Sequence, residues 1–267
     1  MSRDARKSSP QRSQSAAREL LANFYTVERA GGFRLSDGGG PFGFDITTAL
    51  QVDFLMASYG CDGIVETGSF LGDTTTYLAR QYPDTPIRTC DVSEEYASFT
   101  RRRLAGQDNV RVLTGSSDQL LPRLLKNFSR PLVYLDAHWY EHWPIREEIA
   151  LTGTGIVAID DFDIGHRRFS FDEYDGTRLD ARLIARVLPE LDELFVGDPE
   201  ADYPFPCLQT GRRSGTAYLV RGLDPGPLRE SGMFRRIALK PHIQLPSWNT
   251  AGAGAALPGA TASRAGR

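Results

Sequence analysis

Apolar and polar positions alternate along the chain in a pattern that predicts strands and helices in turn. Short apolar runs occur at residues 63–68, 87–92, 110–115, 132–138, 155–162, 193–197 and 215–221. Runs with helical spacing separate the first four of these, at residues 74–82, 94–104 and 117–128. Strands that alternate with helices indicate βαβ units and a mostly parallel sheet covered on both faces. The pattern therefore predicts an α/β protein with one doubly wound sheet of seven strands.

The ends of the chain differ in composition from this central region. Residues 1–17 are rich in Ser, Arg and Gln and are predicted to be disordered. Residues 18–46 predict a helix followed by a Gly-rich lid loop, and residues 47–221 form the predicted core. A second lid segment is predicted at residues 163–180, which are long and polar for a connection between strands. Residues 222–267 form a C-terminal extension that drifts into Gly, Ala and Pro and is expected to be disordered at its end.

Charge and composition exclude several classes of partner. The net charge of −3 argues against a general nucleic-acid binder, which needs a basic face. Apolar stretches fall short of the roughly 20 residues of a membrane helix, and the basic first 20 residues lack the apolar segment of a signal peptide. The three cysteines have no CxxC spacing. We therefore expect a cytoplasmic protein without a nucleic-acid or membrane partner.

The first strand ends in a loop suited to a ligand. Residues 66–72 read E-T-G-S-F-L-G, and ligands of open α/β sheets bind beyond the carboxyl ends of the strands. Gly68 permits a positive φ, and Gly72 opens a helix whose free N–H groups favour polar ligands. Phe70 replaces the second glycine of a dinucleotide loop, which argues against NAD. The alternative is a tight strand-to-helix turn without a ligand.

The tips of the second and third strands extend this site. Asp91 follows Glu66 by 25 residues and ends the second strand, where an acid can accept hydrogen bonds from ribose hydroxyls. Gly115, Ser116 and Ser117 end the third strand, where they can line an adenine pocket. In both places the alternative is a cap of the following helix.

Three carboxylates follow the fourth and fifth strands. Asp136 ends one strand, and Asp160 and Asp161 end the next, so a parallel sheet would bring them to one edge. Clustered carboxylates repel one another unless a cation lies between them, and oxygen ligands suit Mg²⁺ or a similar divalent ion. The alternative is a set of helix caps and exposed acids that never meet.

In their order and spacing, these motifs resemble class I S-adenosylmethionine-dependent methyltransferases. The resemblance covers about residues 47–221 and is greatest to the metal-dependent O-methyltransferases of the catechol and macrocin type. It implies a Rossmann-like sheet whose last strand is antiparallel, and a divalent cation, such as Mg²⁺, held by Asp136, Asp160 and Asp161. It also implies that S-adenosylmethionine binds to Glu66, Thr67, Gly68, Ser69, Gly72, Thr74, Asp91, Gly115, Ser116, Ser117 and Asp136.

The activity implied by this resemblance is methyl transfer to a hydroxyl of a small molecule, such as a sugar, a phenol or another compound of secondary metabolism. The catechol branch has a lysine three positions after the first Asp, where this chain has Trp139. The macrocin-like branch has its proposed base two positions after that Asp, which is His138 here. A metal ligand or a positioning hydrogen-bond donor is the alternative for His138. Trp139, Tyr140 and Trp143 are predicted to line an acceptor pocket or to pack in the core.

Two other functions fit parts of the pattern. Asp136, His138 and a second histidine would suit a non-heme iron oxygenase, which does not need Glu66 or Asp91. A non-catalytic module that binds a nucleoside or a partner protein is a different class, but it gains nothing from three repelling acids. The oligomeric state stays open, with a homodimer among the alternatives, and the sequence does not identify the acceptor.

Overall fold

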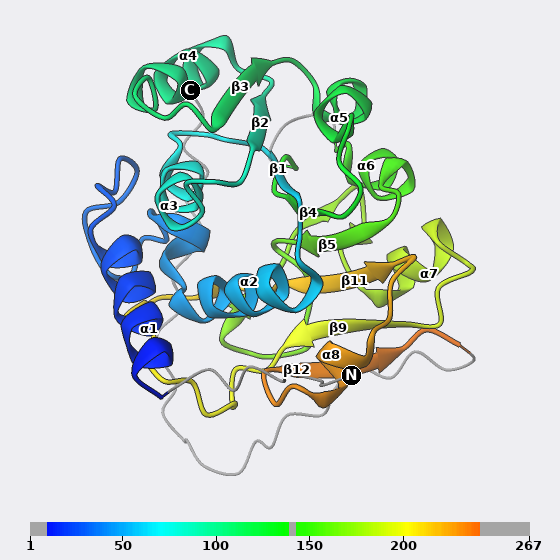
Figure 1. The fold of residues 1–267 in the computed structure, drawn as a ribbon. Helices are drawn as coiled ribbons and strands as arrows, with labels where there is room; N and C mark the ends of the chain where they lie inside the picture. The colour runs from blue at the N-terminus through cyan, green and yellow to red at the C-terminus, as the bar shows by residue number, and fades with distance from the viewer. Residues whose placement is uncertain (1–9, 139–142, 241–267) are drawn as a thin grey trace, which may run out of the picture.

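The computed structural model describes residues 10–138 and 143–240. Its centre is an eight-stranded sheet in the order β12-β9-β11-β5-β4-β1-β2-β3 (Figure 1). Strands β1 to β5 run parallel, whereas β11 is antiparallel to β5 and β9, and β12 is antiparallel to β9. The bounds are β1 Gly63–Thr67, β2 Ile87–Asp91, β3 Val110–Thr114, β4 Pro131–Leu135, β5 Gly155–Ile159, β9 Glu193–Gly197, β11 Ala217–Arg221 and β12 Phe234–Ala238.

All seven predicted strands form, and the seventh, β11, is antiparallel as expected. Two predictions at the chain ends need correction. Helix α1 begins at Pro10, so residues 10–17 are helical rather than disordered. Helix α8 (Gly226–Glu230) and β12 lie in the predicted extension, where β12 adds an eighth strand because its backbone pairs with the edge of β9. Residues 1–9 and 241–267 lie outside the described residues, and the predictions for them stay open.

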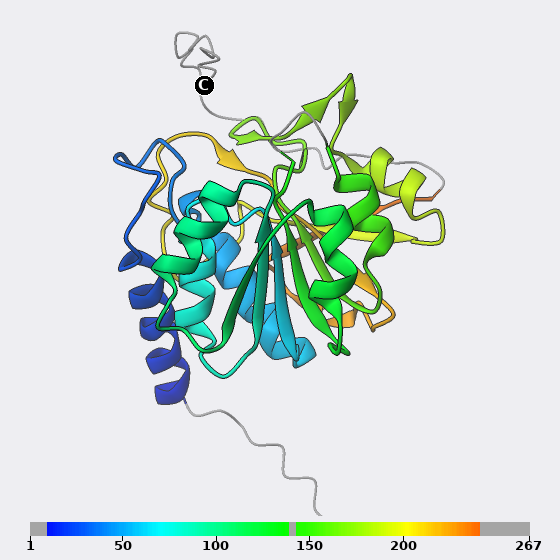
Figure 2. The ribbon, with the colours of Figure 1, turned by 90° about the horizontal axis from the view of Figure 1, so that it is seen from above.

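Helices cover both faces of the sheet (Figure 2). They are α1 (Pro10–Tyr25), α2 (Ile46–Tyr59), α3 (Asp73–Gln81), α4 (Glu94–Arg103), α5 (Ser117–Leu125), α6 (Ile145–Leu151), α7 (Ala181–Val187) and α8, with a short 3₁₀ turn η1 (Pro41–Phe44). Two-stranded ladders join β6 (Phe169–Ser170) to β10 (Arg213–Ser214) and β7 (Glu173–Tyr174) to β8 (Thr177–Arg178). None of the helices in the described ranges combines the length and the apolar character that crossing a bilayer requires.

Alternation along the strands divides the core into two layers. Ile64 and Tyr134 pack with α1, α2 and α3, whereas Val65, Val133 and Leu135 pack with α5, α6 and α7. Successive strand residues point to opposite faces, and both faces are buried here. This explains why the strands read as continuous apolar runs in the sequence.

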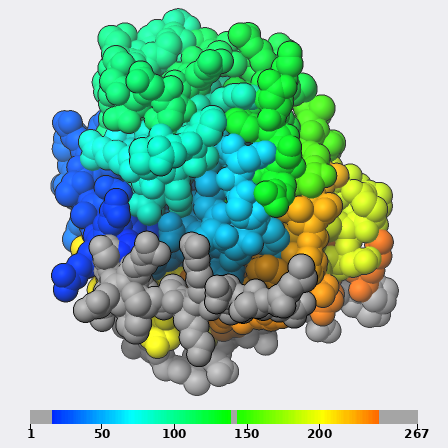
Figure 3. Space-filling view, viewed as in Figure 1, coloured from blue at the N-terminus to red at the C-terminus, as the bar shows by residue number. Residues whose placement is uncertain are grey.

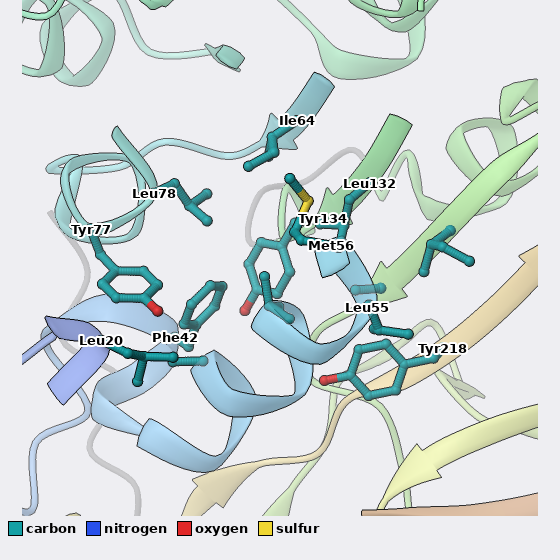
Figure 4. Packing of buried hydrophobic residues seen from close by; sticks show 14 of the residues in the cluster. Leu20, Phe42, Leu55, Met56, Ile64, Tyr77, Leu78, Leu132, Tyr134 and Tyr218 are labelled. Carbon is teal, nitrogen blue, oxygen red and sulfur yellow. The ribbon is translucent and has the colours of Figure 1, made fainter. Parts of the chain in front are cut away.

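Aromatic side chains fix the segment before α2 against the sheet. The ring of Phe42 lies between Tyr77 of α3 and Tyr134 of β4, with centroid distances of 5.6 and 5.1 Å (Figure 4). Phe24 of α1 stacks on Phe44 at 5.8 Å. The space-filling view shows the blue surface of the N-terminal segment beside the teal surface of α3 and α4 (Figure 3). The N-terminal segment is therefore part of the packed core.

A buried ion pair fastens the start of α2 to β10. Asp45 caps α2 by accepting the backbone N–H of Thr47 at 2.9 Å, and it also accepts from Nε of Arg213 at 2.5 Å. Asp45 is 2% exposed and Arg213 is 7% exposed. A second guanidinium nitrogen of Arg213 donates to the hydroxyl of Thr47. The charges are thus paired and hydrogen-bonded, which burial requires.

We predict that Asp45→Asn lowers the free energy of unfolding by about 3 kcal/mol, because it leaves the Arg213 guanidinium buried without its counter-charge. Denaturant titration monitored by circular dichroism measures the change. Glu190→Gln is the matched control: Glu190 pairs with Arg221 at 3.5 Å, but its side chain is 64% exposed. That variant should change stability by less than about 0.5 kcal/mol. Equal effects of both variants would contradict a special role for the buried pair.

Candidate active site

A cavity of about 790 Å³ opens at the carboxyl ends of β1 to β5. Its size is that of a small-molecule site, and its place is the ligand-binding edge of an open α/β sheet. Most of the predicted site residues line it: Gly68, Ser69, Thr74, Asp91, Gly115, Ser116, Ser117, Asp136, Asp160 and Asp161. The tips of all five parallel strands therefore contribute to one site.

Two glycines let the backbone segments of this edge pack closely. Gly68 has φ +79°, and a Cβ built there would lie 2.3 Å from the carbonyl oxygen of Asp136. Gly72 has φ +74°, and its Cβ would lie 2.9 Å from the side chain of Thr100. Gly68 lines the cavity, but Gly72 does not. The contact that the structure gives Gly72 is with Thr100 of α4, and cofactor binding by this glycine stays a prediction.

Glu66 and Thr67 also lie beneath the cavity rather than in its wall. Glu66 is 1% exposed and accepts a hydrogen bond of 2.5 Å from the Thr75 hydroxyl. Burial raises the pKa of Glu66 to about 7. Thr67 accepts the backbone N–H of Asp136 on its hydroxyl at 3.3 Å and on its carbonyl at 3.1 Å. The side chains of both residues are buried and support the loop, and their predicted cofactor contacts stay a prediction.

Asp91 occupies the predicted place at the end of β2. Its two carboxylate oxygens accept the backbone N–H groups of Phe70 and Ser93 at 2.8 and 2.9 Å. Burial raises the pKa of Asp91, and these two hydrogen bonds oppose the rise. Each carboxylate oxygen can accept more than one hydrogen bond. Asp91 therefore keeps acceptor capacity toward the cavity that it lines.

Sequence reasoning missed an apolar rim beside Asp91. Phe70 and Val92 are 51% and 53% exposed, although both are large apolar residues. The rings of Phe70 and Tyr96 meet edge to face with centroids 4.8 Å apart. All three residues line the cavity, so a flat apolar group would find partners there. One feature of the sequence could have indicated this rim: the apolar residue Val92 directly follows Asp91, the acid that ends β2.

The acids after β4 and β5 meet, together with a histidine. One ligand atom each from Asp136, His138 and Asp161 lies within 4.8 Å of the others. His138 Nε2 is 3.6 Å from Asp161 Oδ2, and neither ring nitrogen has a hydrogen-bond partner among the described residues. Asp161 has φ +47° and accepts a hydrogen bond from the hydroxyl of Ser214. A strained backbone at a clustered acid is typical of functional sites.

Asp160 lies beside this cluster and also lines the cavity. Thr216 donates its hydroxyl to Asp160 at 3.3 Å. Burial, together with the charge of Asp161, raises the pKa of Asp160 to about 7. Burial and the charges of Asp160 and Asp161 raise the pKa of Asp136 well above its ordinary value. The three predicted acids are thus close enough to repel one another, and the structure adds His138 to them.

His138 lies buried beside the acids, and its predicted role as the general base stays a prediction. Its side chain has no exposed area, and it is not among the cavity-lining residues. A base must reach the proton it takes directly or through one water. A ring that is buried against Asp161 fits the alternative interpretation, in which His138 is a metal ligand or positions one.

The lid segments contribute unequally to the cavity wall. The predicted N-terminal loop supplies Gly31, Ser36, Asp37, Gly38, Gly39, Gly40 and Gly43, whereas the segment 163–180 supplies Ser170. Trp143 packs in the core, and its indole N–H donates to Asp172 at 2.7 Å. Trp139 and Tyr140 lie outside the described residues. Pro144, Arg212 and Ser214 also line the cavity and carried no recognisable signal in the sequence.

The buried carboxyl of Glu66 gives a test of this geometry by pH. Its folded-state pKa is raised from 4.5 to about 7, so its contribution to stability is full below 4.5 and is lost as the pH rises through about 7. We predict that wild-type protein loses about 3 kcal/mol more stability than Glu66→Gln between pH 4.5 and 8. Denaturant titrations at both pH values measure this difference. Exposed Glu230→Gln is the control, and a Glu66→Gln protein with the wild-type pH dependence would contradict the burial argument.

Comparisons with known proteins agree with this architecture. No protein-family model matches the chain. It is 30% identical to catechol O-methyltransferase of Mus musculus over 121 residues, which are 41% of this chain and 45% of that protein. The corresponding enzyme of Bos taurus is also 30% identical over 121 residues, 41% of this chain and 44% of that protein. The chain thus spans under half the length of the curated relatives it matches.

Solved structures were also matched at low similarity. The O-methyltransferase from Streptomyces achromogenes involved in tomaymycin synthesis, in complex with SAM, is 19% identical, with 81% of this chain and 92% of that chain covered and a TM-score of 0.45. The O-methyltransferase from Bacillus cereus, in complex with SAH, is 17% identical, with 82% and 94% covered and a TM-score of 0.45. Over the matched 121 residues the chain is therefore similar to catechol O-methyltransferases.

Proposed function

We propose that this protein transfers the methyl group of S-adenosylmethionine to a hydroxyl of a small molecule, with the help of a divalent cation. The observation that carries the proposal is the continuity of one cavity from Asp91 to the cluster of Asp136 and Asp161. A nucleoside-binding acid and a cation site in the same cavity bring a methyl donor and a metal-bound hydroxyl together. Such positioning supplies much of the barrier reduction in group transfer.

The donor half of the cavity fits an adenosine. Asp91 would accept the ribose hydroxyls, while Phe70, Val92 and Tyr96 offer apolar surface for the base. Gly115, Ser116 and Ser117 follow the end of β3, the strand next to β2. The methionine end would then reach Ser69, Thr74 and Asp136 near the start of α3. An ammonium group there would meet the carboxylate of Asp136.

The acceptor half fits a divalent cation. Asp136 and Asp161 would supply oxygen ligands, His138 is placed to supply a nitrogen ligand, and Asp160 stands beside them. A histidine nitrogen broadens the choice from Mg²⁺ toward Mn²⁺ and other transition metals. When bound, such an ion lowers the pKa of an acceptor hydroxyl. The residues of the chain hold the site: Thr67 fixes the backbone of Asp136, and Ser214 fixes the carboxylate of Asp161.

The two alternatives receive less support from the geometry. The cluster among the described residues contains two carboxylates and a single histidine, whereas the iron site of an oxygenase typically has two histidines and one carboxylate. A non-catalytic module would have no need for acids whose pKa values are raised by burial and by mutual repulsion. A calorimetric titration with S-adenosylmethionine, with and without Mg²⁺, separates these alternatives from the proposal.

For the donor half, we predict that Asp91→Ala weakens S-adenosylmethionine binding at least tenfold, because even one lost charged hydrogen bond costs ~1.4 kcal/mol. Isothermal titration calorimetry measures the affinity, and circular dichroism verifies the fold. Asp84→Ala, an exposed acid outside the cavity, is the control and should bind normally. An unchanged affinity in folded Asp91→Ala protein would remove Asp91 from the site.

For the acceptor half, we predict that excess chelator abolishes methyl transfer to a catechol probe and that Mg²⁺ or Mn²⁺ restores it. His138→Ala should raise the metal concentration for half-maximal activity about tenfold or more, while saturating metal restores most of the rate. His166→Ala is the control outside the cluster. Full activity in chelator would refute the metal role. A rate loss in His138→Ala that no metal concentration restores would favour the base role instead.

A further inference from the structure

The charges around the cavity are strongly unequal. Six acids line it: Asp37, Asp73, Asp91, Asp136, Asp160 and Asp161. Arg212 is the single cation among the described lining residues. Negative charge near Asp91 and the acid cluster would be offset by the sulfonium and ammonium groups of the proposed donor and by a divalent cation. Arg212 lies two residues before Ser214, whose hydroxyl donates to Asp161 of that cluster.

Arg212 immediately precedes β10, which pairs with β6. Arg213 pairs with Phe169, and Ser214 pairs with Ser170. Neighbouring residues of an extended strand face opposite sides, and alternate residues share a side. Arg213 faces the core, where it pairs with Asp45, whereas Arg212 and Ser214 both line the cavity.

This arrangement sets a distance between Arg212 and the acid cluster. Ser214 donates a hydrogen bond to Asp161 and therefore lies beside the proposed cation site. Arg212 lies two residues earlier, which corresponds to about 7 Å along an extended chain. Since Arg212 and the acids line one cavity, an acceptor of about one ring that chelates at the cluster would come within reach of the Arg212 side chain. Ser170, Ser214 and Pro144 line the same cavity.

The guanidinium of Arg212 is oriented but not neutralised by the described part of the chain. One of its nitrogens donates to the carbonyl of Phe169 at 3.0 Å, and it forms no ion pair with a described residue. Arg213, its neighbour, is by contrast fully paired with Asp45. An arginine has five N–H donors in a planar fork, which matches an oxyacid group with two acceptor oxygens. Arg212 therefore keeps donors for a ligand.

We propose that Arg212 binds an anionic oxyacid group of the acceptor, so that the natural acceptor carries a carboxylate or a similar group about one ring away from the methylated hydroxyl. This inference rests on the proposed function and deepens it by naming the charge of the acceptor. Arg212 acts as a specificity residue: it holds the far end of the acceptor and takes no part in the transfer of the methyl group.

Three probes of nearly equal shape test the proposal: 3,4-dihydroxybenzoate, which is anionic, 3,4-dihydroxybenzamide, which is neutral, and 3,4-dihydroxybenzylamine, which is cationic. Wild-type protein with saturating S-adenosylmethionine and Mg²⁺ should prefer the benzoate. Arg212→Gln should raise KM for the benzoate about tenfold, equivalent to ~1.4 kcal/mol, and leave KM for the benzamide within twofold. Arg212→Lys should retain part of the preference, and Arg212→Glu should shift it toward the amine.

Arg168→Gln is the matched control, because Arg168 is an exposed arginine of the same ladder region that does not line the cavity. Equal KM changes for benzoate and benzamide in Arg212→Gln would mean that Arg212 only fastens Phe169, which overturns the proposal. A wild-type protein that uses the benzamide as well as the benzoate overturns it too, while the methyltransferase function stands. If wild-type protein binds S-adenosylmethionine but turns over none of the probes, the anionic aromatic acceptor is refuted, and absent cofactor binding refutes the proposed function itself.

Discussion

The structure depends on the close meeting of two backbone turns at the carboxyl edge of the sheet. The loop after β1 crosses the end of β4 so tightly that a Cβ on Gly68 would lie 2.3 Å from the carbonyl oxygen of Asp136. This contact, with the hydrogen bonds from Asp136 N–H to Thr67, places the donor loop and the first acid of the cation cluster side by side. A larger residue at position 68 would separate the two halves of the cavity. In the proposed function, the methyl donor and the acceptor would share one site because the backbone permits this approach.

The sequence predicts the sheet well because its strands are buried on both faces and its helices are amphipathic. Glu66 shows the limit of such reasoning: a residue at a strand tip can face the ligand or the core, and alternation along β1 turned it toward Thr75. The apolar signal of β12 was hidden within a Gly- and Pro-containing tail, because an edge strand needs only backbone pairing on one side. Arg212 had no signal at all, since its role depends on a ladder between segments about 40 residues apart in sequence.

The cation cluster illustrates a different limit. Spacing predicted that Asp136 and Asp161 would meet, since the ends of neighbouring parallel strands share an edge. It did not predict that His138 would turn inward and lose all exposed area. The turn after β4 decides this orientation, and turn geometry depends on the packing of the loops around it. A histidine with two unpartnered nitrogens beside two acids is costly to bury unless a further group completes its hydrogen bonding or ligation.

The same β10 segment serves both stability and recognition, which constrains how the site can change. Arg213 ties this segment to Asp45 at the start of α2, and thereby to the N-terminal loop that lines the cavity. Ser214 bonds to Asp161, and Arg212 faces the space beyond. Because successive residues of an extended segment point to opposite sides, a one-residue shift of β10 would exchange the buried and cavity-facing arginines and break both contacts. The length of this segment is therefore more tightly constrained than the identity of Arg212. Substitution at position 212 can alter the acceptor's charge preference without disturbing the scaffold that holds the acids in place.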